Sequence, residues 1–361
     1  MRILHLAPRL SLRGGADQYW LSLVAGLEAC CEQRLVVGAV DNTAQTTLPT
    51  RICGALNARD DAVVELDMEL RWKPDVIHIH NVVNPWLLNW AHSQPAVVTI
   101  QDHRYFCPGR GKWRAGKSRC NTCMGRAGEG DGEPCVTCLG NRSYFEQLSD
   151  LTWRRFEALQ GLRLTVLSRY MRDELVALGL AEEHVAVIPP FVQDWPAGAA
   201  EDPSVLFAGR LVESKGVFDV LEAYDRVDLP WPLVFVGTGS ARSALEGAGA
   251  CVLGWVDRAA LGAWLRGARV LVMPSRWQEP FGIIGLEALS LGTPVAAWES
   301  GGVAEWHPGG PGLVSWGDVD GLAGAMGRLA RGPRAKAAVG FEREVLMAQM
   351  MALYEEVAGT C

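Results

Sequence analysis

Short apolar runs without polar alternation recur along this chain, and they limit its fold more than any other feature. In the first half these runs are 2–8, 34–40, 75–81, 96–102, 162–168 and 185–191. Strands of this composition are buried on both faces, which requires a parallel sheet covered by helices. Helical patterns at 14–29 and 170–179 lie between them. The first half therefore predicts a doubly wound α/β domain.

The pattern stops and then starts again, which predicts a second domain of the same kind. Residues 192–203 are rich in proline, alanine and acidic residues, as in a linker. A chain of 361 residues is also too long for one core of usual size. The second set comprises strands at 204–211, 232–239, 251–256 and 269–275, and helices at 216–227, 240–248, 257–268 and 282–291. We expect an N-terminal domain (1–191), a linker (192–203), a C-terminal domain (204–334) and a final segment (335–361) whose helix at 335–357 is a candidate for crossing back to the first domain.

Charge and hydropathy exclude some classes of protein. The net charge of −7 argues against a chain that binds nucleic acid over its whole surface. No apolar run reaches the length of a membrane-spanning helix. The N-terminal run leads directly into a glycine turn, as a first buried strand does. We expect a cytoplasmic protein without an obligate protein partner, and peripheral contact with the inner face of the membrane is compatible with this.

The segment "EPFGIIGLEALSLGTPV" (279–295) is the strongest chemical motif. Its residues 281–283 open a helix, whose free amides and dipole favour an anion. Glu279 and Glu287 flank that point, and carboxylates accept hydrogen bonds from sugar hydroxyls. A helix with an acidic first turn explains the segment equally well when it is taken alone.

Two cations after a strand favour the ligand site. Arg210 and Lys215, in "FAGRLVESKG", follow the strand at 204–211 and can neutralise a diphosphate. Glycines that allow close backbone approach end other strands, namely Gly14, Gly15, Gly237 and Gly239. Asp318 and Asp320, in "DVD", imitate a metal motif, but their place before a helical pattern predicts a helix cap.

Together these motifs resemble the retaining glycosyltransferases of family 4, which have the GT-B fold of two Rossmann-like domains facing a cleft. The resemblance covers nearly the whole chain, "PDVIHIHN" included. It implies that Arg210 and Lys215 grip the diphosphate of a UDP- or GDP-sugar, and that Glu287 holds the ribose. The transferred sugar, the phosphates and the base would contact Glu279, Phe281, Gly282, Ile283, Gly14, Gly15, Gly237, Gly239 and Val256. The sugar would move with retained configuration and without a catalytic divalent metal.

One departure from the family pattern concerns the acceptor side. Relatives commonly have His-Asp where this chain has Gln101-Asp102, and His103 follows. Either Gln101 fills the place as a neutral hydrogen-bonding group or His103 reaches in. Asp102 and His103 therefore join Glu279, Arg210 and Lys215 as catalytic candidates. His78 and His80 are interpreted as buried strand-end histidines.

A cysteine-rich, basic insert at 103–140 interrupts the first domain. Cys120, Cys123, Cys135 and Cys138 form two C-x2-C pairs, a spacing that predicts a structural zinc site. Paired disulfides and an iron–sulfur cluster are the alternatives, and Cys107 lies nearby. Basic residues with interleaved aromatics predict binding of an anionic acceptor, a lipid-phosphate-linked glycan or a nucleic acid such as tRNA. The acceptor-binding candidates are Gln101, Arg104, Arg110, Lys112, Arg114 and Lys117. A hydrolase or epimerase of nucleotide sugars, and a zinc-dependent binding module on an inactive scaffold, are the rival functions.

Zinc content tests the insert. The purified protein should hold about one zinc ion per chain, bound by four thiolates. Elemental analysis measures the metal, and thiol trapping in freshly lysed cells measures the oxidation state of the cysteines. Metal-free protein with those four cysteines oxidised in pairs would contradict the prediction.

Overall fold

The computed structural model describes residues 1–58, 62–109, 111–114, 118–120 and 141–359. The chain forms two compact units. The first contains Met1–Lys112, Asn121–Pro190 and Arg343–Cys361, and the second contains Trp113–Cys120 and Phe191–Glu342. Within the described residues, no helix has the length and apolar character needed to cross a membrane.

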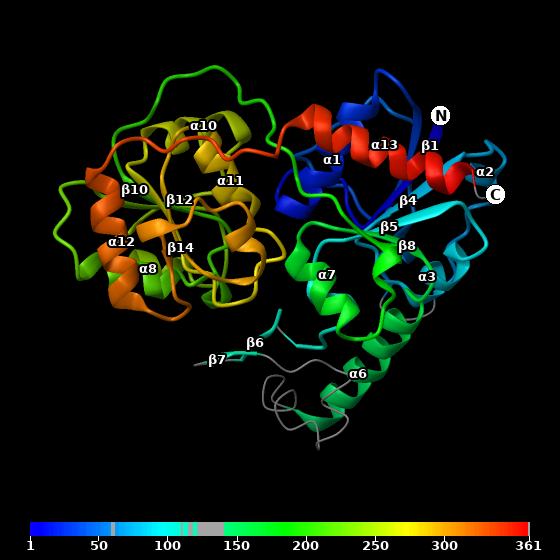
Figure 1. Ribbon diagram of the computed structural model, residues 1–361, viewed down its shortest axis with the longest axis horizontal. Coiled ribbons are helices and arrows are strands. Elements are labelled where there is room, and N and C mark those ends of the chain that lie inside the picture. Colours follow the sequence, from blue (N-terminus) through cyan, green and yellow to red (C-terminus); the bar gives the residue numbers. More distant parts are fainter. Residues whose placement is uncertain (59–61, 110, 115–117, 121–140, 360–361) are drawn as a thin grey trace. The chain divides into compact units, whose positions relative to one another are not determined.

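The first unit is a parallel sheet of seven strands (Figure 1). Its order is β3-β2-β1-β4-β5-β8-β9, so the chain reverses direction across the sheet between β1 and β4. The strands are β1 (Arg2–Ala7), β2 (Glu32–Val37), β3 (Thr50–Ile52), β4 (Val76–His80), β5 (Ala96–Ile100), β8 (Arg163–Val166) and β9 (Val185–Val187). The helices are α1 (Gly15–Leu27), α2 (Asp67–Leu70), α3 (Pro85–Ala91), α6 (Arg142–Glu157), α7 (Arg169–Val176) and α13 (Arg343–Gly359). The predicted doubly wound architecture is confirmed, and β3, α2, α3 and α6 are additions to it.

The second unit repeats the architecture with six parallel strands in the order β12-β11-β10-β13-β14-β15. The strands are β10 (Val205–Ala208), β11 (Leu233–Val236), β12 (Cys251–Gly254), β13 (Val270–Met273), β14 (Val295–Trp298) and β15 (Leu313–Val314). The helices are α8 (Val217–Asp225), α9 (Arg242–Gly247), α10 (Arg258–Gly267), α11 (Ile283–Ser290) and α12 (Val319–Arg331). The short strands β6 (Trp113–Arg114) and β7 (Ser118–Arg119) pair as an antiparallel hairpin.

Two predictions about helix ends have clear outcomes. Asp318 caps α12, because its side chain accepts a hydrogen bond from the Gly321 amide at 2.8 Å, as predicted. The final helix begins at Arg343 rather than at 335. Gly340 has a φ of +89°, a left-handed conformation that is incompatible with a right-handed helix running through this residue.

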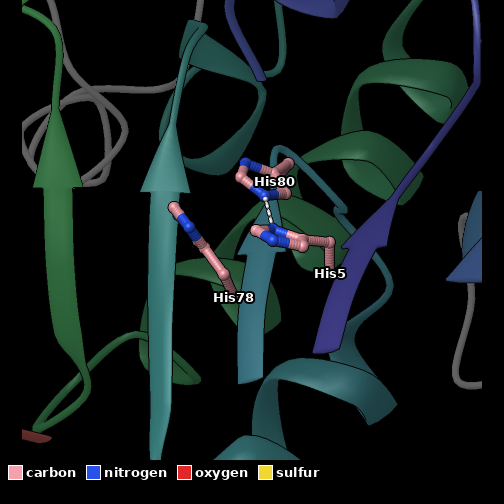
Figure 2. Close-up of side chains that lie close together, drawn as sticks. All are labelled: His5, His78 and His80. Carbon is pink, nitrogen blue, oxygen red and sulfur yellow. Dashed lines mark hydrogen bonds between the residues drawn. The ribbon is translucent and has the colours of Figure 1, made fainter. Parts of the chain in front are cut away.

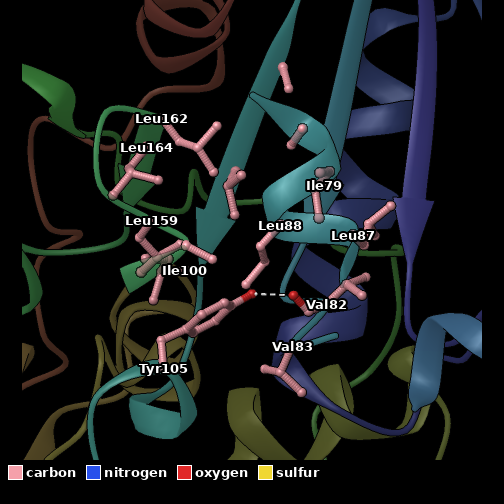
Figure 3. Packing of buried hydrophobic residues seen from close by; sticks show 14 of the residues in the cluster. Ile79, Val82, Val83, Leu87, Leu88, Ile100, Tyr105, Leu159, Leu162 and Leu164 are labelled. Atoms are coloured by element: carbon pink, nitrogen blue, oxygen red, sulfur yellow. Dashed lines mark hydrogen bonds between the residues drawn. The ribbon is translucent and has the colours of Figure 1, made fainter. Parts of the chain in front are cut away.

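The two faces of the first sheet bury different cores. One face packs under α3, α6 and α7, where the Tyr105 hydroxyl donates to the Val82 carbonyl at 2.9 Å among aliphatic side chains (Figure 3). The other face packs under α1 and α13, through residues such as Leu23, Leu27 and Leu353. The C-terminal helix therefore completes the hydrophobic core of the N-terminal sheet (Figure 1).

Three histidines interrupt the face under α1 and α13. His5, His78 and His80 are fully buried, and Figure 2 shows them side by side on β1 and β4. The His5 and His80 nitrogens are 2.9 Å apart, and the Gln33 side-chain oxygen lies 2.9 Å from the other nitrogen of His5. Both nitrogens of His78 contact hydroxyl groups at 2.6 Å, those of Tyr354 and Thr99.

The direction of these hydrogen bonds follows from Gln33. Its amide nitrogen donates to the Val24 carbonyl at 3.0 Å, so its oxygen must accept from Nε2–H of His5. Nδ1 of neutral His5 then accepts from Nε2–H of His80. Hydrogen bonds thus satisfy both ring nitrogens of His5 and of His78, whereas Nδ1 of His80 has no partner among the described residues. Burial lowers the pKa of all three histidines, to about 4 for His5.

Acid should therefore destabilise the first unit. Unfolding lets each histidine bind a proton near its ordinary pKa, so the free energy of unfolding falls as the pH drops below about 6.5, by up to ~1.4 kcal/mol per pH unit for each histidine. In His5→Gln, urea unfolding between pH 7.5 and pH 5 should show a shallower loss than in the wild-type protein. Parallel curves for the two proteins would contradict the prediction.

Candidate functional site

The second sheet positions two functional loops next to each other. β10 and β13 are hydrogen-bonded neighbours, and the strand order reverses between them. The loop after β10 carries Arg210 and Lys215, and the loop after β13 carries Glu279. Ligands of doubly wound sheets bind at such a reversal, outside the carboxyl ends of the strands. Lys215 and Glu279, 64 positions apart in the sequence, are thus brought together by the strand order.

The centre of the site is an ion pair. The Lys215 ammonium lies 2.6 Å from the Glu279 carboxylate, and their side chains are 18% and 6% exposed. The Ser275 hydroxyl donates to the same carboxylate oxygen. Burial by itself would raise the pKa of Glu279, but the Lys215 charge and hydrogen bonds from Lys215 and Ser275 hold the pKa below its usual value. Glu279 is therefore an ionised acceptor at neutral pH.

A tryptophan lies beneath both cations. The Trp277 ring centroid is 4.4 Å from the Lys215 ammonium and 5.4 Å from the Arg210 guanidinium carbon. Sequence reasoning missed Trp277 and Ser275. The available signal was an aromatic residue two positions before Glu279, in a segment that follows a buried strand. Lys215 has a lowered pKa, chiefly through burial and also through the Arg210 charge.

The helix at the motif begins where the sequence predicted. α11 starts at Ile283, and Gly282 precedes it with a φ of +88° and no capping side chain. The Phe281 side chain is buried, and its carbonyl accepts a hydrogen bond from the Trp306 indole at 2.5 Å. The Phe281–Ile283 turn is therefore held in place by Trp306. Because Gly282 has no side chain, it does not bond the first-turn amides of α11.

Glu287 has a partner that sequence reasoning missed. The Arg258 guanidinium lies 2.7 Å from the Glu287 carboxylate and 3.9 Å from the Trp195 ring centroid. It also donates to the Gln193 carbonyl at 3.4 Å. Burial raises the pKa of Glu287, and Arg258 opposes that shift. Arg258 is thus the counterion that favours the ionised form of this carboxylate.

The glycines of the second unit serve close loop packing. A Cβ on Gly237 would lie 1.8 Å from the Gly209 carbonyl oxygen, and one on Gly239 would lie 2.2 Å from the Leu211 carbonyl oxygen. Both contacts fall on the loop that carries Arg210. Gly237 and Gly239 therefore allow close packing against the loop that carries Arg210. Val256, another candidate of the sequence analysis, lies half-buried after β12.

The first unit presents paired charges at the carboxyl edge of its sheet. Gly14 precedes α1, and a Cβ there would lie 3.2 Å from the Asp17 carboxylate. Arg9 pairs with Asp17 and was missed by sequence reasoning. Burial raises the pKa of Asp17, and Arg9 opposes that shift. Gly15, the first residue of α1, follows in the same turn.

The segment after β5 holds the remaining acceptor-side candidates. Asp102 accepts from Asn81 at 3.0 Å and pairs with Arg104 at 2.8 Å. The Nε2 of His103 lies 3.0 Å from the Tyr170 hydroxyl. The Gln101 side chain is buried, and its amide nitrogen has no partner among the described residues.

Few residues of the basic insert have side chains that the structure describes. Lys112 was expected to face an acceptor, but its side chain is 4% exposed and its ammonium lies 2.5 Å from Glu174. It braces the first unit instead of presenting charge to solvent. Arg110, Lys117, Cys123, Cys135 and Cys138 lie outside the described residues, as does the side chain of Arg114. Cys120 is described as a half-buried cysteine, and the zinc site stays a prediction.

Solved structures with the same fold define the class of protein. Sucrose-phosphate synthase from Thermosynechococcus elongatus superposes with a TM-score of 0.69 at 17% identity, over 100% of both chains. HepE from Anabaena, in complex with UDP and glucose, gives 0.63 at 13% identity, over 99% of this chain and 100% of its own. At these identities the likeness establishes the fold, the α/β GT-B architecture.

Family models identify the chain more closely. The model described as "Glycosyltransferase Family 4" matches residues 13–194, and the one described as "Glycosyl transferases group 1" matches 202–331. The protein belongs to glycosyltransferase family 4.

Curated relatives agree with this assignment. The glycogen synthase of Mycobacterium tuberculosis is 29% identical over 75% of this chain and 64% of its own length, so the chain spans less than two thirds of that relative. A phosphatidyl-myo-inositol mannosyltransferase of Mycolicibacterium smegmatis is 32% identical over 47% of this chain and 48% of its own length.

Removing Arg258 should expose the cost of the buried Glu287 carboxylate. We expect Arg258→Gln to lower the free energy of unfolding by on the order of 2 kcal/mol at pH 8, somewhat less than for a fully buried pair. Because burial raises the pKa of Glu287, protonation relieves this deficit as the pH falls toward 5. Urea unfolding at the two pH values measures it.

A second change separates the ion pair from general damage. Adding Glu287→Gln to the variant should recover part of the loss, because no unpaired charge remains. Arg266→Gln is the matched control, since Arg266 lies on the same helix and contacts the Pro196 carbonyl. A deficit independent of pH, or equal in the control, would contradict the prediction.

Proposed function

We propose that this protein transfers a sugar from a UDP- or GDP-sugar to an anionic acceptor with retention of the anomeric configuration. The observation that carries the proposal is the Lys215–Glu279 pair, 2.6 Å long, with Arg210 beside it at the strand reversal. It places two cations and an ionised carboxylate at one point. Solved relatives described with bound UDP and UDP-glucose support a donor of this class.

In this mechanism the cations act on the leaving diphosphate. Negative charge develops on that group as the glycosidic bond breaks, and Arg210, Lys215 and the first-turn amides of α11 stabilise it without reorganising. These groups of the chain take the place that a divalent metal has in other transferases. The acceptor hydroxyl attacks the anomeric carbon from the face that the nucleotide leaves, which preserves the configuration.

The carboxylates orient the donor. Glu279 is ionised and accepts hydrogen bonds from the hydroxyls of the transferred sugar, while Glu287 accepts from the ribose. Asp102 and His103 are the residues we assign to the acceptor hydroxyl, with Gln101 as a neutral hydrogen-bonding group. We propose that the acceptor is a lipid-phosphate-linked glycan whose phosphate is bound by Arg104 and the basic insert.

Relatives support this class of acceptor through what their names state. They include a phosphatidyl-myo-inositol mannosyltransferase and a lipopolysaccharide core glycosyltransferase of Rhizobium meliloti, which is 31% identical over 54% of this chain. A nucleic acid is the alternative anionic acceptor. Contacts to phosphate predict that the acceptor KM rises with salt in either case.

A donor and variant series tests the proposed function. Nucleotide-sugar consumption should require one of the UDP- or GDP-sugars and an acceptor, and NMR of the product should show the anomeric configuration of the donor. Arg210→Ala and Lys215→Ala should each lose about 2–4 kcal/mol of transition-state stabilisation, measured as kcat/KM. Glu279→Gln should lower kcat more than nucleotide affinity, because its charge is used on the sugar.

Arg226→Ala is the matched control, since Arg226 pairs with carboxylates on the surface of the second unit and should leave kcat/KM unchanged. Consumption of donor without acceptor would indicate a hydrolase or epimerase. Wild-type turnover in both cation variants would refute the diphosphate site, and binding of zinc without any turnover would favour the inactive-scaffold alternative.

A further inference from the structure

Trp277 occupies an unusual place for an indole, beneath two cations that share one ring. The Lys215 ammonium lies 4.4 Å and the Arg210 guanidinium carbon 5.4 Å from its centroid. Lys215 has Glu279 as its counterion. Arg210 is exposed, and among the described residues no carboxylate pairs with it. The three charged groups therefore sum to one net positive charge on an aromatic surface.

The backbone holds this indole against the loop that carries Lys215. The Trp277 amide donates to the Ser214 carbonyl at 3.1 Å, one residue before Lys215. The Trp277 carbonyl accepts from the Ser300 hydroxyl at 2.6 Å. The backbone of Trp277 is thus held by the loop after β10 and by the segment after β14.

The segment 300–302 fixes the next two residues in the same way. The Gly301 amide donates to the Gln278 side-chain oxygen at 3.0 Å, and the Gly302 amide donates to the Glu279 carbonyl at 2.8 Å. Gly301 has a φ of +55°, and a Cβ there would lie 2.1 Å from the Glu279 carbonyl oxygen. Three consecutive residues, 277–279, are therefore held by three consecutive residues of another loop.

This arrangement has an electrostatic consequence. Two cations that approach one another repel, and the negative face of an indole offsets that repulsion for both of them. The face attracts the charges without using up their N–H donors, so those donors remain available to an anion. A single phosphoryl group needs one such cation, whereas two linked phosphoryl groups gain from a fixed distance between both.

We propose that Trp277 is a positioning residue that sets the spacing of Arg210 and Lys215, and so makes this site selective for a nucleoside diphosphate over a nucleoside monophosphate. The inference rests on the proposed function, since it takes the diphosphate of the donor as the ligand of the two cations. It adds a residue that touches neither the sugar nor the base, and a preference that is measurable without turnover.

Binding measurements on the full chain test it. Titration calorimetry with UDP, UMP, GDP and GMP gives the affinities of the wild-type protein. The variants are then measured with the diphosphate and monophosphate of the base that the wild-type protein prefers. Trp277→Leu should weaken the diphosphate about tenfold, on the scale of losing cation–π attraction at two cations. Affinity for the monophosphate should stay within about twofold. Trp277→Phe keeps a weaker aromatic face and should lose only about threefold for the diphosphate.

Controls separate this effect from damage to the loop. Trp316 donates to the Arg276 carbonyl at 3.1 Å and so braces the same loop away from the cations. Trp316→Phe should leave the ratio of diphosphate to monophosphate affinity unchanged. If Trp277→Leu does not fold, Trp277→Phe still decides the matter, because the inference requires its loss to fall on the diphosphate alone. In the Arg210→Gln background, Trp277→Phe should have a smaller effect than in wild type.

The outcomes distinguish the inference from the proposed function. A wild-type chain that binds neither UDP nor GDP overturns both. Wild-type binding that is kept in the Trp277 variants, or an equal loss for diphosphate and monophosphate, overturns the inference and leaves the donor assignment standing. A selective loss for the diphosphate, with the Trp316 control unchanged, supports the positioning role.

Discussion

The Lys215–Glu279 ion pair is the interaction on which the proposed donor site of this protein depends. A buried carboxylate without a partner would be costly, and the lysine that neutralises it is also a candidate ligand of the donor. The pair joins the loop after β10 to the loop after β13, so the same contact stabilises the fold and places the charges of the site. Because Trp277 lies under the lysine and Ser275 reaches the glutamate, neither charge has freedom to move alone.

A second carboxylate is managed differently. Glu287 is held by Arg258, whose guanidinium is stacked on Trp195 from the segment of the second unit before β10. Burial raises the pKa of Glu287 while its partner opposes the shift, whereas the combined partners of Glu279 overcome burial and lower its pKa. Two glutamates of one motif therefore have different electrostatic settings, which fits the separate tasks of binding sugar and ribose that we propose for them.

The first unit shows how a polar stripe survives in a core. His5 and His78 are tolerated beneath α1 and α13 because Gln33, Tyr354 and Thr99 supply hydrogen-bonding partners, and His80 donates to His5. Because burial lowers the pKa of these histidines, we expect acid to weaken the docking of the C-terminal helix onto this sheet. At the carboxyl edge of the same sheet, Arg9 and Arg104 are paired with aspartates, so the described part of that edge is close to charge balance.

The sequence alone determined the architecture, because fully apolar strands are compatible only with covered parallel sheets and because the pattern occurs twice. It also proposed Arg210, Lys215, Glu279 and Glu287 as site residues, since charged residues after buried strands fall at one edge of the sheet. It did not reveal Ser275, Trp277 or Arg258, because their importance comes from what they contact across the chain rather than from local periodicity. Lys112 shows the same limit: a lysine in a basic run predicts exposure, and only tertiary packing against Glu174 decided that it is buried. Local pattern determines which elements form, and the strand order determines which side chains meet.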